Sequence, residues 1–399
     1  MIKVAVLGCG VIGVQHAALL GAHPAYTVVA VIDPKSESTA KAAAAAVERA
    51  GEAGHDQQAP AAYETLTEAL AAGGIDLVSI CTPSGRHAAQ AEECIRAGVH
   101  TVIEKPLDIT VPRGRALLEV EATHAQPGQV ISVISQHRFD PAHQVTKTAI
   151  DQGRLGSVTS AVASMAWYRT QEYYDGGDWR GTWELDGGGA VMNQAVHTVD
   201  LLRWYLGEPV QVSAQAGLLA HERIEVEDVL TATISFASGA LAVLHASTAA
   251  YPGLTTRIQV HGTAGSSIVD RDQLDYFFSA VDASGAEGAR AEGGSTTEVK
   301  AAANAAEAMV PAEHLRSNPP ETGTFAKAHS RQFDDIAEAI SQGRPPGVTL
   351  TEAHLSLALV RALYTSASLG QPVLFADVLD GAYDDTVTRF SSTPTRQGS

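Results

Sequence analysis

The sequence predicts an α/β protein with two domains. We expect an N-terminal doubly wound parallel sheet, and a C-terminal α/β domain with a large open, mostly antiparallel sheet. The chain has 399 residues, which is more than one compact hydrophobic core usually holds. Its first third alternates short apolar runs with helix-forming segments, as βα units do. After about residue 150 the pattern changes to partial two-residue alternation of apolar and polar side chains.

The first domain is expected at residues 1–135. Its strands should be apolar on both faces, because helices cover both sides of a parallel sheet. The expected strands are Ile2–Leu7, Thr27–Asp33, Ile75–Thr82, His100–Ile103 and Gln129–Ser135. The segments Ser36–Arg49 and Ala88–Ala97 are rich in Ala, Glu, Lys and Arg, which predicts helices between these strands.

The second domain is expected at residues 136–375, followed by a C-terminal tail at 376–399. Residues 281–324 are poor in hydrophobic side chains, which predicts a flexible surface excursion. Ser238-Gly239 should form a hairpin turn between two of the strands. The expected strands are Ser157–Arg169, Val210–Gly217, Val229–Phe236 and Gly239–Thr248, and the expected helices are Ala190–Leu206, His329–Gln342 and Thr349–Leu369.

Composition limits the classes of partner. The formal net charge is −18, and without a basic stripe we expect no nucleic-acid partner. The three cysteines, Cys9, Cys81 and Cys94, have neither disulfide-framework nor metal-ligand spacing. We therefore expect no metal and a reducing compartment. The chain begins with a strand rather than a signal peptide, and no apolar run is long enough to cross a bilayer. A cytoplasmic location without a membrane partner is the resulting expectation.

The segment from Gly8 to Gly13 reads GCGVIG and lies between the first strand and the first helix. In a Rossmann domain, Gly8 allows the tight turn, Gly10 lets the pyrophosphate approach, and Gly13 lets helix and strand pack. The helix start at Val11 and Ile12 presents free N–H groups to the phosphates. Asp33 ends the second strand, where a carboxylate binds ribose hydroxyls and repels a 2′-phosphate. The expected cofactor is NAD, with NADP possible because Lys35 and Ser36 follow Asp33.

Lys105 follows the strand His100–Ile103, in the sequence Glu104-Lys105-Pro106. It is therefore expected at the carboxyl edge of the parallel sheet, where such sheets bind ligands. A lysine at this edge can hydrogen-bond a substrate oxygen and stabilise its negative charge. On position alone, a solvated surface lysine is an equally good interpretation.

Asn193 and His197 lie four residues apart in the helix expected at Ala190–Leu206, so they should share one face. His197 can accept a hydroxyl proton near neutral pH, and Asn193 can both donate to and accept from a sugar hydroxyl. Asp200 is placed either to orient His197 or to pair with Arg203. Spacing alone favours the alternative interpretation, a histidine that is simply satisfied within the core.

A third candidate segment is rich in aromatic and arginine side chains, which are common in sugar sites. From it we select Trp167, Arg169 and Trp179 as candidate substrate-binding residues. Sheet packing or an oligomer contact is the alternative interpretation for each of these residues.

Together these segments resemble the Gfo/Idh/MocA oxidoreductases, the family of glucose-fructose oxidoreductase and inositol dehydrogenase. The motifs that match are GCGVIG at 8–13, CTPSGRH at 81–87, EKP at 104–106 and GGGAVMNQAVHTVDLLRWYLG at 187–207. The resemblance implies that Lys105 and His197 act on the substrate. It also implies cofactor contacts from Thr82, Pro83, His87 and Glu104, and a second domain whose sheet mediates a homodimer or homotetramer.

One departure bears on the substrate. Many members of the family have an aspartate where this chain has Asn193, whereas a group resembling the nucleotide-sugar 3-dehydrogenases has Asn-Gln, as at 193–194. This favours oxidation of a pyranose ring position such as C3 over an inositol substrate.

The expected activity is NAD-dependent hydride transfer to or from a secondary hydroxyl of a sugar, sugar derivative or cyclitol. Two alternatives stay open at this point: an NAD-dependent glycosidase that oxidises its substrate transiently, and a non-catalytic NAD-sensing regulator.

Overall fold

The structure is a computed structural model that describes residues 1–177, 179–283, 304–319 and 323–390. Two compact units divide the chain. The first comprises residues 1–136, 178–188 and 325–358, and the second comprises 137–177, 189–324 and 359–399. Two segments that follow residue 136 in the sequence thus belong to the first unit. Within the described residues, no helix is long and apolar enough to cross a membrane.

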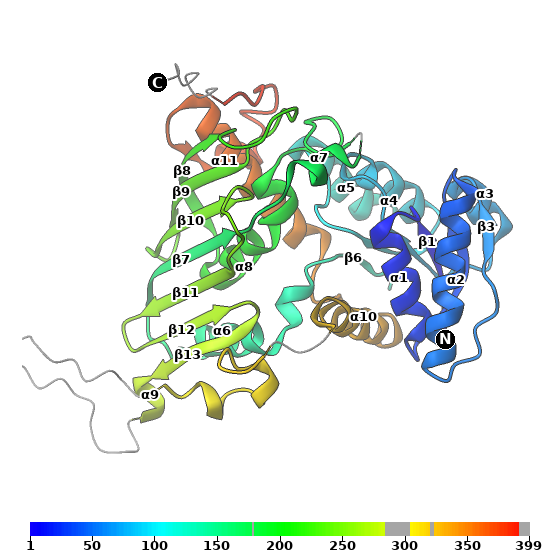
Figure 1. Ribbon diagram of the computed structural model, residues 1–399, viewed down its shortest axis with the longest axis horizontal. Coiled ribbons are helices and arrows are strands. Elements are labelled where there is room, and N and C mark those ends of the chain that lie inside the picture. Colours follow the sequence, from blue (N-terminus) through cyan, green and yellow to red (C-terminus); the bar gives the residue numbers. More distant parts are fainter. Residues whose placement is uncertain (178, 284–303, 320–322, 391–399) are drawn as a thin grey trace, which may run out of the picture. The chain divides into compact units, whose positions relative to one another are not determined.

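The first unit is built on a six-stranded parallel sheet with the strand order β3-β2-β1-β4-β5-β6 (Figure 1). This is the strand order of a Rossmann dinucleotide-binding domain. The strands are β1 (Ile2–Leu7), β2 (Tyr26–Ile32), β3 (Ala61–Tyr63), β4 (Leu77–Ile80), β5 (His100–Ile103) and β6 (Ile131–Val133). The helices that connect them are α1 (Val11–Ala22), α2 (Ser36–Glu52), α3 (Leu66–Ala72), α4 (His87–Arg96) and α5 (Val111–His124). The expected doubly wound parallel sheet is confirmed.

Helix α10 (Thr324–Gln342) also belongs to the core of the first unit, although it lies far away in the sequence. Its buried Phe333 and Ile336 share one apolar cluster with Val4 of β1 and Leu20 of α1. The hydroxyl of Tyr26 donates to the backbone carbonyl of Phe333 at 2.7 Å. Helical spacing predicted the helix, but not the sheet against which it packs.

The second unit contains an eight-stranded mixed sheet in the order β13-β12-β11-β7-β10-β9-β8-β14 (Figure 1). Strands β7 and β10 pair in parallel and the other neighbours are antiparallel, which confirms the expected open, mostly antiparallel sheet. The strands are β7 (Val158–Ala166), β8 (Pro209–Gly217), β9 (Val229–Phe236), β10 (Leu241–Ser247), β11 (Thr256–Gly262), β12 (Gly265–Asp270), β13 (Gln273–Ser279) and β14 (Val373–Leu374).

The helices of the second unit are α6 (Pro141–Asp151), α7 (Gln171–Asp175), α8 (Val196–Leu206), α9 (Ala280–Ala283) and α12 (Phe375–Leu379). Helix α11 (Leu350–Leu369) belongs partly to each unit. The β9–β10 hairpin turns at Gly239, whose φ of +87° favours glycine, as the Ser238-Gly239 signal predicted. Strands β11 to β13 had no counterpart among the expected strands.

Two predictions need correction. Residues 304–319 of the expected surface excursion pack on the second unit, with Val310 and Leu315 buried and Arg316 N–H bonded to the Leu274 carbonyl at 3.0 Å. Residues 284–303 and 320–322 of that excursion lie outside the described residues. The first part of the expected tail forms α12, with Val378 buried.

Candidate active site

The glycine turn after β1 is formed as a dinucleotide-binding turn requires. Gly8 has a φ of +86°, where only glycine is relaxed. A Cβ on Gly13 would lie 1.8 Å from the carbonyl oxygen of Gly8, so this close approach of helix and turn excludes any side chain. At Gly10, by contrast, an added Cβ would meet no atom of the protein within 4 Å.

The start of α1 fits a bound pyrophosphate. Val11 and Ile12 are its first residues, so their N–H groups have no partner within the helix. The side chain of Val11 is 70% exposed beside the open space at Gly10. Bound NAD would cover all three features. Its phosphates and ribose would lie over the free N–H groups of the helix, the open space at Gly10 and the exposed side chain of Val11.

Asp33, directly after β2, lies against the same turn. Its Oδ2 accepts from the N–H of Cys9 at 2.9 Å, and its Oδ1 accepts from the N–H of Lys35 at 2.9 Å. A carboxylate has about four acceptor positions, so ribose hydroxyls can still donate to it. The turn thus orients the carboxylate that the sequence assigned to ribose recognition.

The expected cofactor residues after β4 are connected to the EKP segment, residues 104–106, by hydrogen bonds of His87. Both ring nitrogens of the buried His87 face backbone carbonyls, that of Pro106 at 2.7 Å and that of Thr82 at 2.8 Å. The Thr82 hydroxyl donates to Gln90 at 2.5 Å. His87 therefore holds the turn at Thr82 and Pro83 against the residue that follows Lys105.

Glu104 is buried in a network that sequence analysis did not identify. Its Oε1 lies 3.0 Å from Nε2 of His16 in α1 and 3.5 Å from Nε2 of His329 in α10. Burial alone would raise the pKa of Glu104, but hydrogen bonds from the two histidines outweigh it and hold that pKa well below its usual range. The other oxygen accepts from the backbone N–H of Lys105 at 3.1 Å, so an ionised Glu104 fixes the start of the EKP segment.

In the second unit, the helix expected at Ala190–Leu206 is divided. Residues Ala190–Gln194 form a π-helical turn, and α8 begins at Val196. Asn193 thus lies in the π turn and His197 in the first turn of α8. The inference that they share one face assumed uninterrupted α-helical periodicity, and this assumption is wrong. Such π turns are common at functional sites.

A buried carboxylate holds the π turn. Glu227 accepts from the backbone N–H groups of Gly189 at 2.9 Å and Val191 at 2.8 Å, and from the Tyr364 hydroxyl at 2.9 Å. Burial raises the pKa of Glu227 to about 7, although these hydrogen bonds act in the opposite direction. Residues distant in the sequence meet here, so no local pattern indicated this contact.

Gln194 joins two of the candidate substrate residues, Asn193 and Arg169, to Tyr173. Its amide nitrogen donates to Asn193 Oδ1 at 3.2 Å and to the Tyr173 hydroxyl at 2.9 Å, and its Oε1 accepts from Arg169 at 2.7 Å. The Arg169 guanidinium lies 5.2 Å from the centre of the Trp167 ring. Among the described residues, nothing accepts a hydrogen bond from the buried Nε of Arg169. This cluster therefore offers a donor to a ligand oxygen.

The remaining candidates have other surroundings. The ring of His197 lies 5.0 Å from that of His137, measured between centroids. Asp200 makes a two-point ion pair with Arg138, at 2.6 and 2.7 Å, a partner that the sequence did not suggest. Trp179 belongs to the first unit, where Arg180 lies over its ring at 5.4 Å.

Two histidine–carboxylate groups could be mistaken for metal sites. His16, Glu104 and His329 bring three potential ligand atoms within 4.8 Å of one another, as do His137, Asp140 and Asp272. In each group the nitrogen–oxygen distances begin at 2.8 to 3.0 Å, which is hydrogen-bond geometry. Hydrogen bonding accounts for both groups, and we assign neither to a metal.

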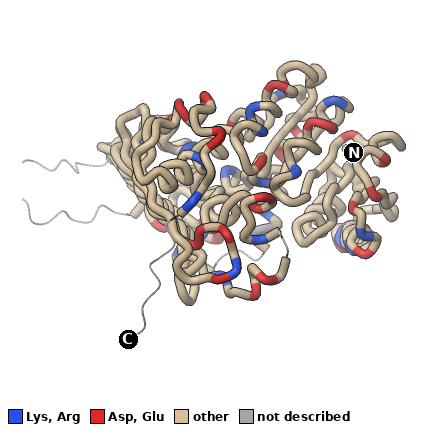
Figure 2. Tube along the Cα trace, turned by 90° about the horizontal axis from the view of Figure 1, so that it is seen from above, with Lys and Arg blue, Asp and Glu red and all other residues tan. Residues whose placement is uncertain are grey.

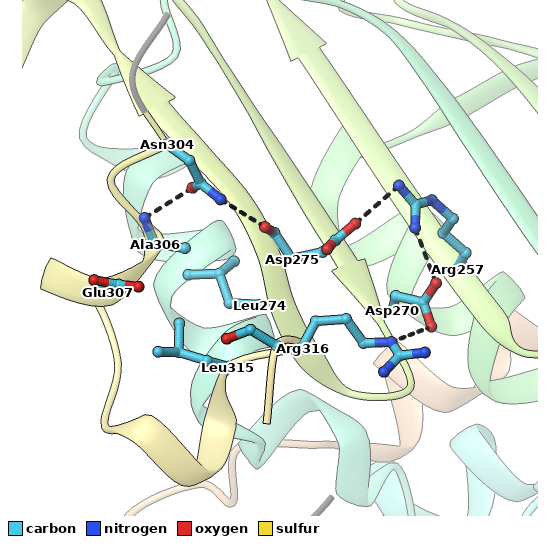
Figure 3. A pocket seen from close by; sticks show the side chains of 10 residues that line it. Arg257, Asp270, Leu274, Asp275, Asn304, Ala306, Glu307, Leu315 and Arg316 are labelled. Atoms are coloured by element: carbon cyan, nitrogen blue, oxygen red, sulfur yellow. Dashed lines mark hydrogen bonds and ion pairs between the residues drawn. The ribbon is translucent and has the colours of Figure 1, made fainter. Parts of the chain in front are cut away.

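A pocket of about 420 Å³ lies elsewhere in the second unit, beside β11 and β13 (Figure 3). Four of its charged residues are paired with each other: Arg257 contacts Asp270 and Asp275, each at 2.9 Å, and Arg316 contacts Asp270 at 3.1 Å. No candidate residue from the sequence lines it. We assign it no part in catalysis.

The fold and the glycine turn define an NAD-binding Rossmann oxidoreductase, and comparison with known proteins specifies the family. Residues 2–132 match the oxidoreductase family with an NAD-binding Rossmann fold, and residues 143–268 match the GFO/IDH/MocA C-terminal domain. The chain belongs to the GFO/IDH/MocA oxidoreductase family, as its motifs indicated.

Three similar proteins illustrate this family. An inositol 2-dehydrogenase of Rhizobium meliloti is 33% identical over 270 residues, which are 66% of this chain and 74% of that protein. The scyllo-inositol 2-dehydrogenase (NAD(+)) of Bacillus subtilis is 27% identical over 384 residues, which are 93% and 96% of the two chains. The structure of the WlbA dehydrogenase from Bordetella pertussis, in complex with NADH and UDP-GlcNAcA, is 29% identical in sequence with a TM-score of 0.75. The match covers 94% of this chain and 97% of that chain.

Proposed function

We propose that the protein is an NAD-dependent dehydrogenase that oxidises a secondary hydroxyl of a sugar, sugar derivative or cyclitol, in a reversible reaction. One observation best supports this proposal. This chain, a member of the family with an open dinucleotide turn, has both Lys105 after β5 and His197 at the start of α8. A protein that only sensed NAD would need neither a lysine nor a proton acceptor for the substrate.

The proposed roles follow from the chemistry of the two side chains. His197 accepts the proton of the reacting hydroxyl. Lys105 donates a hydrogen bond to the same oxygen and stabilises its negative charge. Bound NAD accepts the hydride, and the turn at Gly8–Gly13, the start of α1 and Asp33 hold it. Asn193 orients the hydroxyl through its amide.

The cluster around Gln194 points to a substrate with an acidic or strongly hydrogen-bonding group. The buried Nε of Arg169 needs an acceptor, and an arginine fork suits a carboxylate or phosphate oxygen. The similar WlbA structure contains UDP-GlcNAcA, which carries both groups. We therefore propose a nucleotide sugar or an acidic sugar as substrate, oxidised at a pyranose ring position such as C3.

We also propose that the protein works as a homodimer or homotetramer in the cytoplasm. The sheet of the second unit exposes Val162, Leu241 and Val243, with exposed fractions of 38%, 62% and 47%. These side chains lie on adjacent strands, since Val243 pairs with Val162. An exposed apolar group at the centre of a sheet favours self-association. The three free thiols are consistent with a reducing compartment.

The test is a spectrophotometric screen for NADH formation with nucleotide sugars, acidic sugars, free sugars and cyclitols. A dehydrogenase accumulates NADH, whereas a glycosidase that oxidises transiently regenerates NAD. His197→Ala should lower kcat by roughly 10²–10⁴-fold and leave NAD binding nearly unchanged. The control is His245→Gln, because His245 lies on β10 and contacts Ser164. No NADH with any of these compounds, or near-normal kcat in His197→Ala, would contradict the proposal.

A further inference from the structure

His137 lies between two carboxylates and a second histidine. It belongs to the 3-10 turn Gln136–Phe139, directly before α6. Its Nδ1 is 2.8 Å from Asp140 Oδ2 and 3.2 Å from Asp272 Oδ1. Its ring lies 5.0 Å from the ring of His197, with an interplanar angle of 82°. All four residues belong to the second unit.

The position of Asp272 is set by the hairpin between β12 and β13. Its φ of +61° lies in the left-handed region, which aspartate and asparagine adopt more readily than most residues. Its Oδ1 also lies 3.2 Å from Nε2 of His143, whose Nδ1 is 2.6 Å from the hydroxyl of Tyr205. One carboxylate oxygen thus contacts two histidines.

Most of the other charged groups near α8 have partners of their own. Arg138 is paired with Asp200 of α8, and β7 contributes no ionisable side chain. On α6, which packs against α8, Lys147 is paired with Asp151. On β11, which also packs against α8, Arg257 is paired with Asp270 and Asp275, and His261 is hydrogen-bonded to the Ser266 hydroxyl. Asp140 and Asp272 are the carboxylates that contact His137 directly, and the charge of Asp200 also favours the charged form of His137.

Their effect on His137 is large. Burial disfavours the charged imidazolium, but the carboxylates of Asp272 and Asp140 outweigh it and raise the pKa of His137 to about 9. His137, His143 and His197 in turn hold the pKa of Asp272 below its usual range, against the effect of burial. Because this attraction is mutual, Asp272 also favours the charged form of His197, in opposition to the repulsion from His137. His137 is accordingly a cation throughout the neutral pH range, beside a histidine that must be neutral to accept a proton.

We propose that His137 is a positioning residue for His197: held as a cation by Asp140 and Asp272, it keeps the adjacent His197 ring in the neutral, proton-accepting form. Two like charges about 5 Å apart at a partly screened site disfavour the second protonation by roughly one to two pH units. The catalytic consequence rests on the proposed function, but the effect on protonation does not.

The experiment measures protonation directly in the whole chain. Histidines labelled with ¹³C at Cε1 are titrated by NMR from about pH 5 to 10, and the signals of His197 and His137 are assigned by their loss in His197→Gln and His137→Gln. His137→Gln removes the cation, whereas His137→Arg keeps it. His245→Gln is the matched control, since it removes a histidine of β10 whose Nδ1 contacts the Ser164 hydroxyl of β7 at 3.1 Å.

In His137→Gln, the titration midpoint of His197 should rise by roughly one to two pH units, because the repelling charge is gone. His137→Arg should show less than half of that rise, and His245→Gln should show none. In the unmodified protein, the signal of His137 should stay in its charged form up to about pH 9. This last measurement keeps the test decisive if a variant does not fold.

A midpoint of His197 that stays within about 0.3 pH units in His137→Gln would overturn the inference, as would a His137 that loses its proton below about pH 7. Both results are independent of turnover. If the midpoints shift as expected, the acid limb of kcat for His137→Gln should move to higher pH by a similar amount. Shifted midpoints without any NADH formation would support the electrostatic inference and reject the proposed dehydrogenase.

Discussion

Replacing Glu227 by glutamine should change how stability depends on pH. In the folded protein, burial raises the pKa of Glu227 to about 7, compared with 4.5 for an ordinary glutamate. Between these two values the folded state keeps a proton that the unfolded state releases. The free energy of unfolding of the unmodified protein must therefore fall as pH rises through this window, by about 3 kcal/mol in total. Most of this loss should be complete by about pH 8.

Glu227→Gln cannot titrate, so it lacks this decrease. Below about pH 4 the comparison is between a neutral acid and a neutral amide in both the folded and unfolded states, so the two proteins should be similarly stable. As pH rises, the variant should gain on the unmodified protein until it leads by about 3 kcal/mol. Other groups titrate equally in both proteins and cancel in the difference. The glutamine also keeps an oxygen that can accept from Gly189 or Val191.

The assay is urea denaturation at about pH 5, 6, 7 and 8, followed by tryptophan fluorescence. Glu208→Gln is the control, because Glu208 is an exposed carboxylate in the same unit. For the control, the difference from the unmodified protein should change by less than about 0.5 kcal/mol across the range. If the difference for Glu227→Gln is equally flat, Glu227 does not have a raised pKa, and our account of the π turn is wrong.

Three further predictions concern the cofactor and the assembly. Gly10→Ala should keep the stability of the fold, because the added Cβ meets no protein atom within 4 Å. It should nevertheless weaken NAD binding by roughly 10–100-fold in calorimetric titration, whereas the control Gly51→Ala should not. If Gly10→Ala binds NAD as tightly as the unmodified protein, the pyrophosphate does not lie at Gly10. Asp33→Ser should narrow the preference for NAD over NADP by roughly tenfold, and tighter binding of NADP to the unmodified protein would refute the assignment of Asp33. Leu241→Lys combined with Val243→Lys should yield a monomer in light scattering, and an unchanged mass would show that this sheet face is not the interface.

The sequence was sufficient for the parts of the fold whose patterns are local. The glycine turn, the strand His100–Ile103 and the hairpin at Gly239 were predicted at the positions where the structure has them. Each depends on a few consecutive residues with one dominant physical requirement, such as a positive φ or a continuous apolar run. Strands β11 to β13 were missed because their alternation of buried and exposed side chains is irregular.

The net charge of the sequence argued against a nucleic-acid partner but did not locate a binding site, and Figure 2 shows why. Over the described residues, basic positions are scattered among acidic ones along the surface helices and loops, so charge indicates no single binding face. The functionally interesting charges are instead buried ones, such as Glu104 and Glu227. Their environments combine residues from distant segments, and a composition or a short motif contains no information about such contacts.

His137 shows how much of the candidate site was accessible in principle. His137, Asp140 and His143 recur at three-residue spacing, a signal that sequence analysis could have used. It would have placed His137 beside Asp140, as the 2.8 Å contact confirms. It would not have supplied Asp272, which comes from a hairpin more than a hundred residues further along the chain. Without that second carboxylate, the charge of His137 could not have been inferred.

At the π turn, the sequence motif identified the candidate residues, but contacts with distant residues determine the local backbone. The GGGAVMNQAVH segment identified Asn193 and His197 as candidates, but its residues alone predict a continuous α-helix. The turn is wider because Gly189 and Val191 donate to Glu227, and because Met192 N–H donates to Tyr364 at 3.0 Å. A Cβ on Gly189 would lie 1.8 Å from the carbonyl oxygen of Glu227, so glycine is required for this contact. Gly189 is therefore explained by the close approach of a distant residue, Glu227, which meets it through both its backbone carbonyl and its carboxylate.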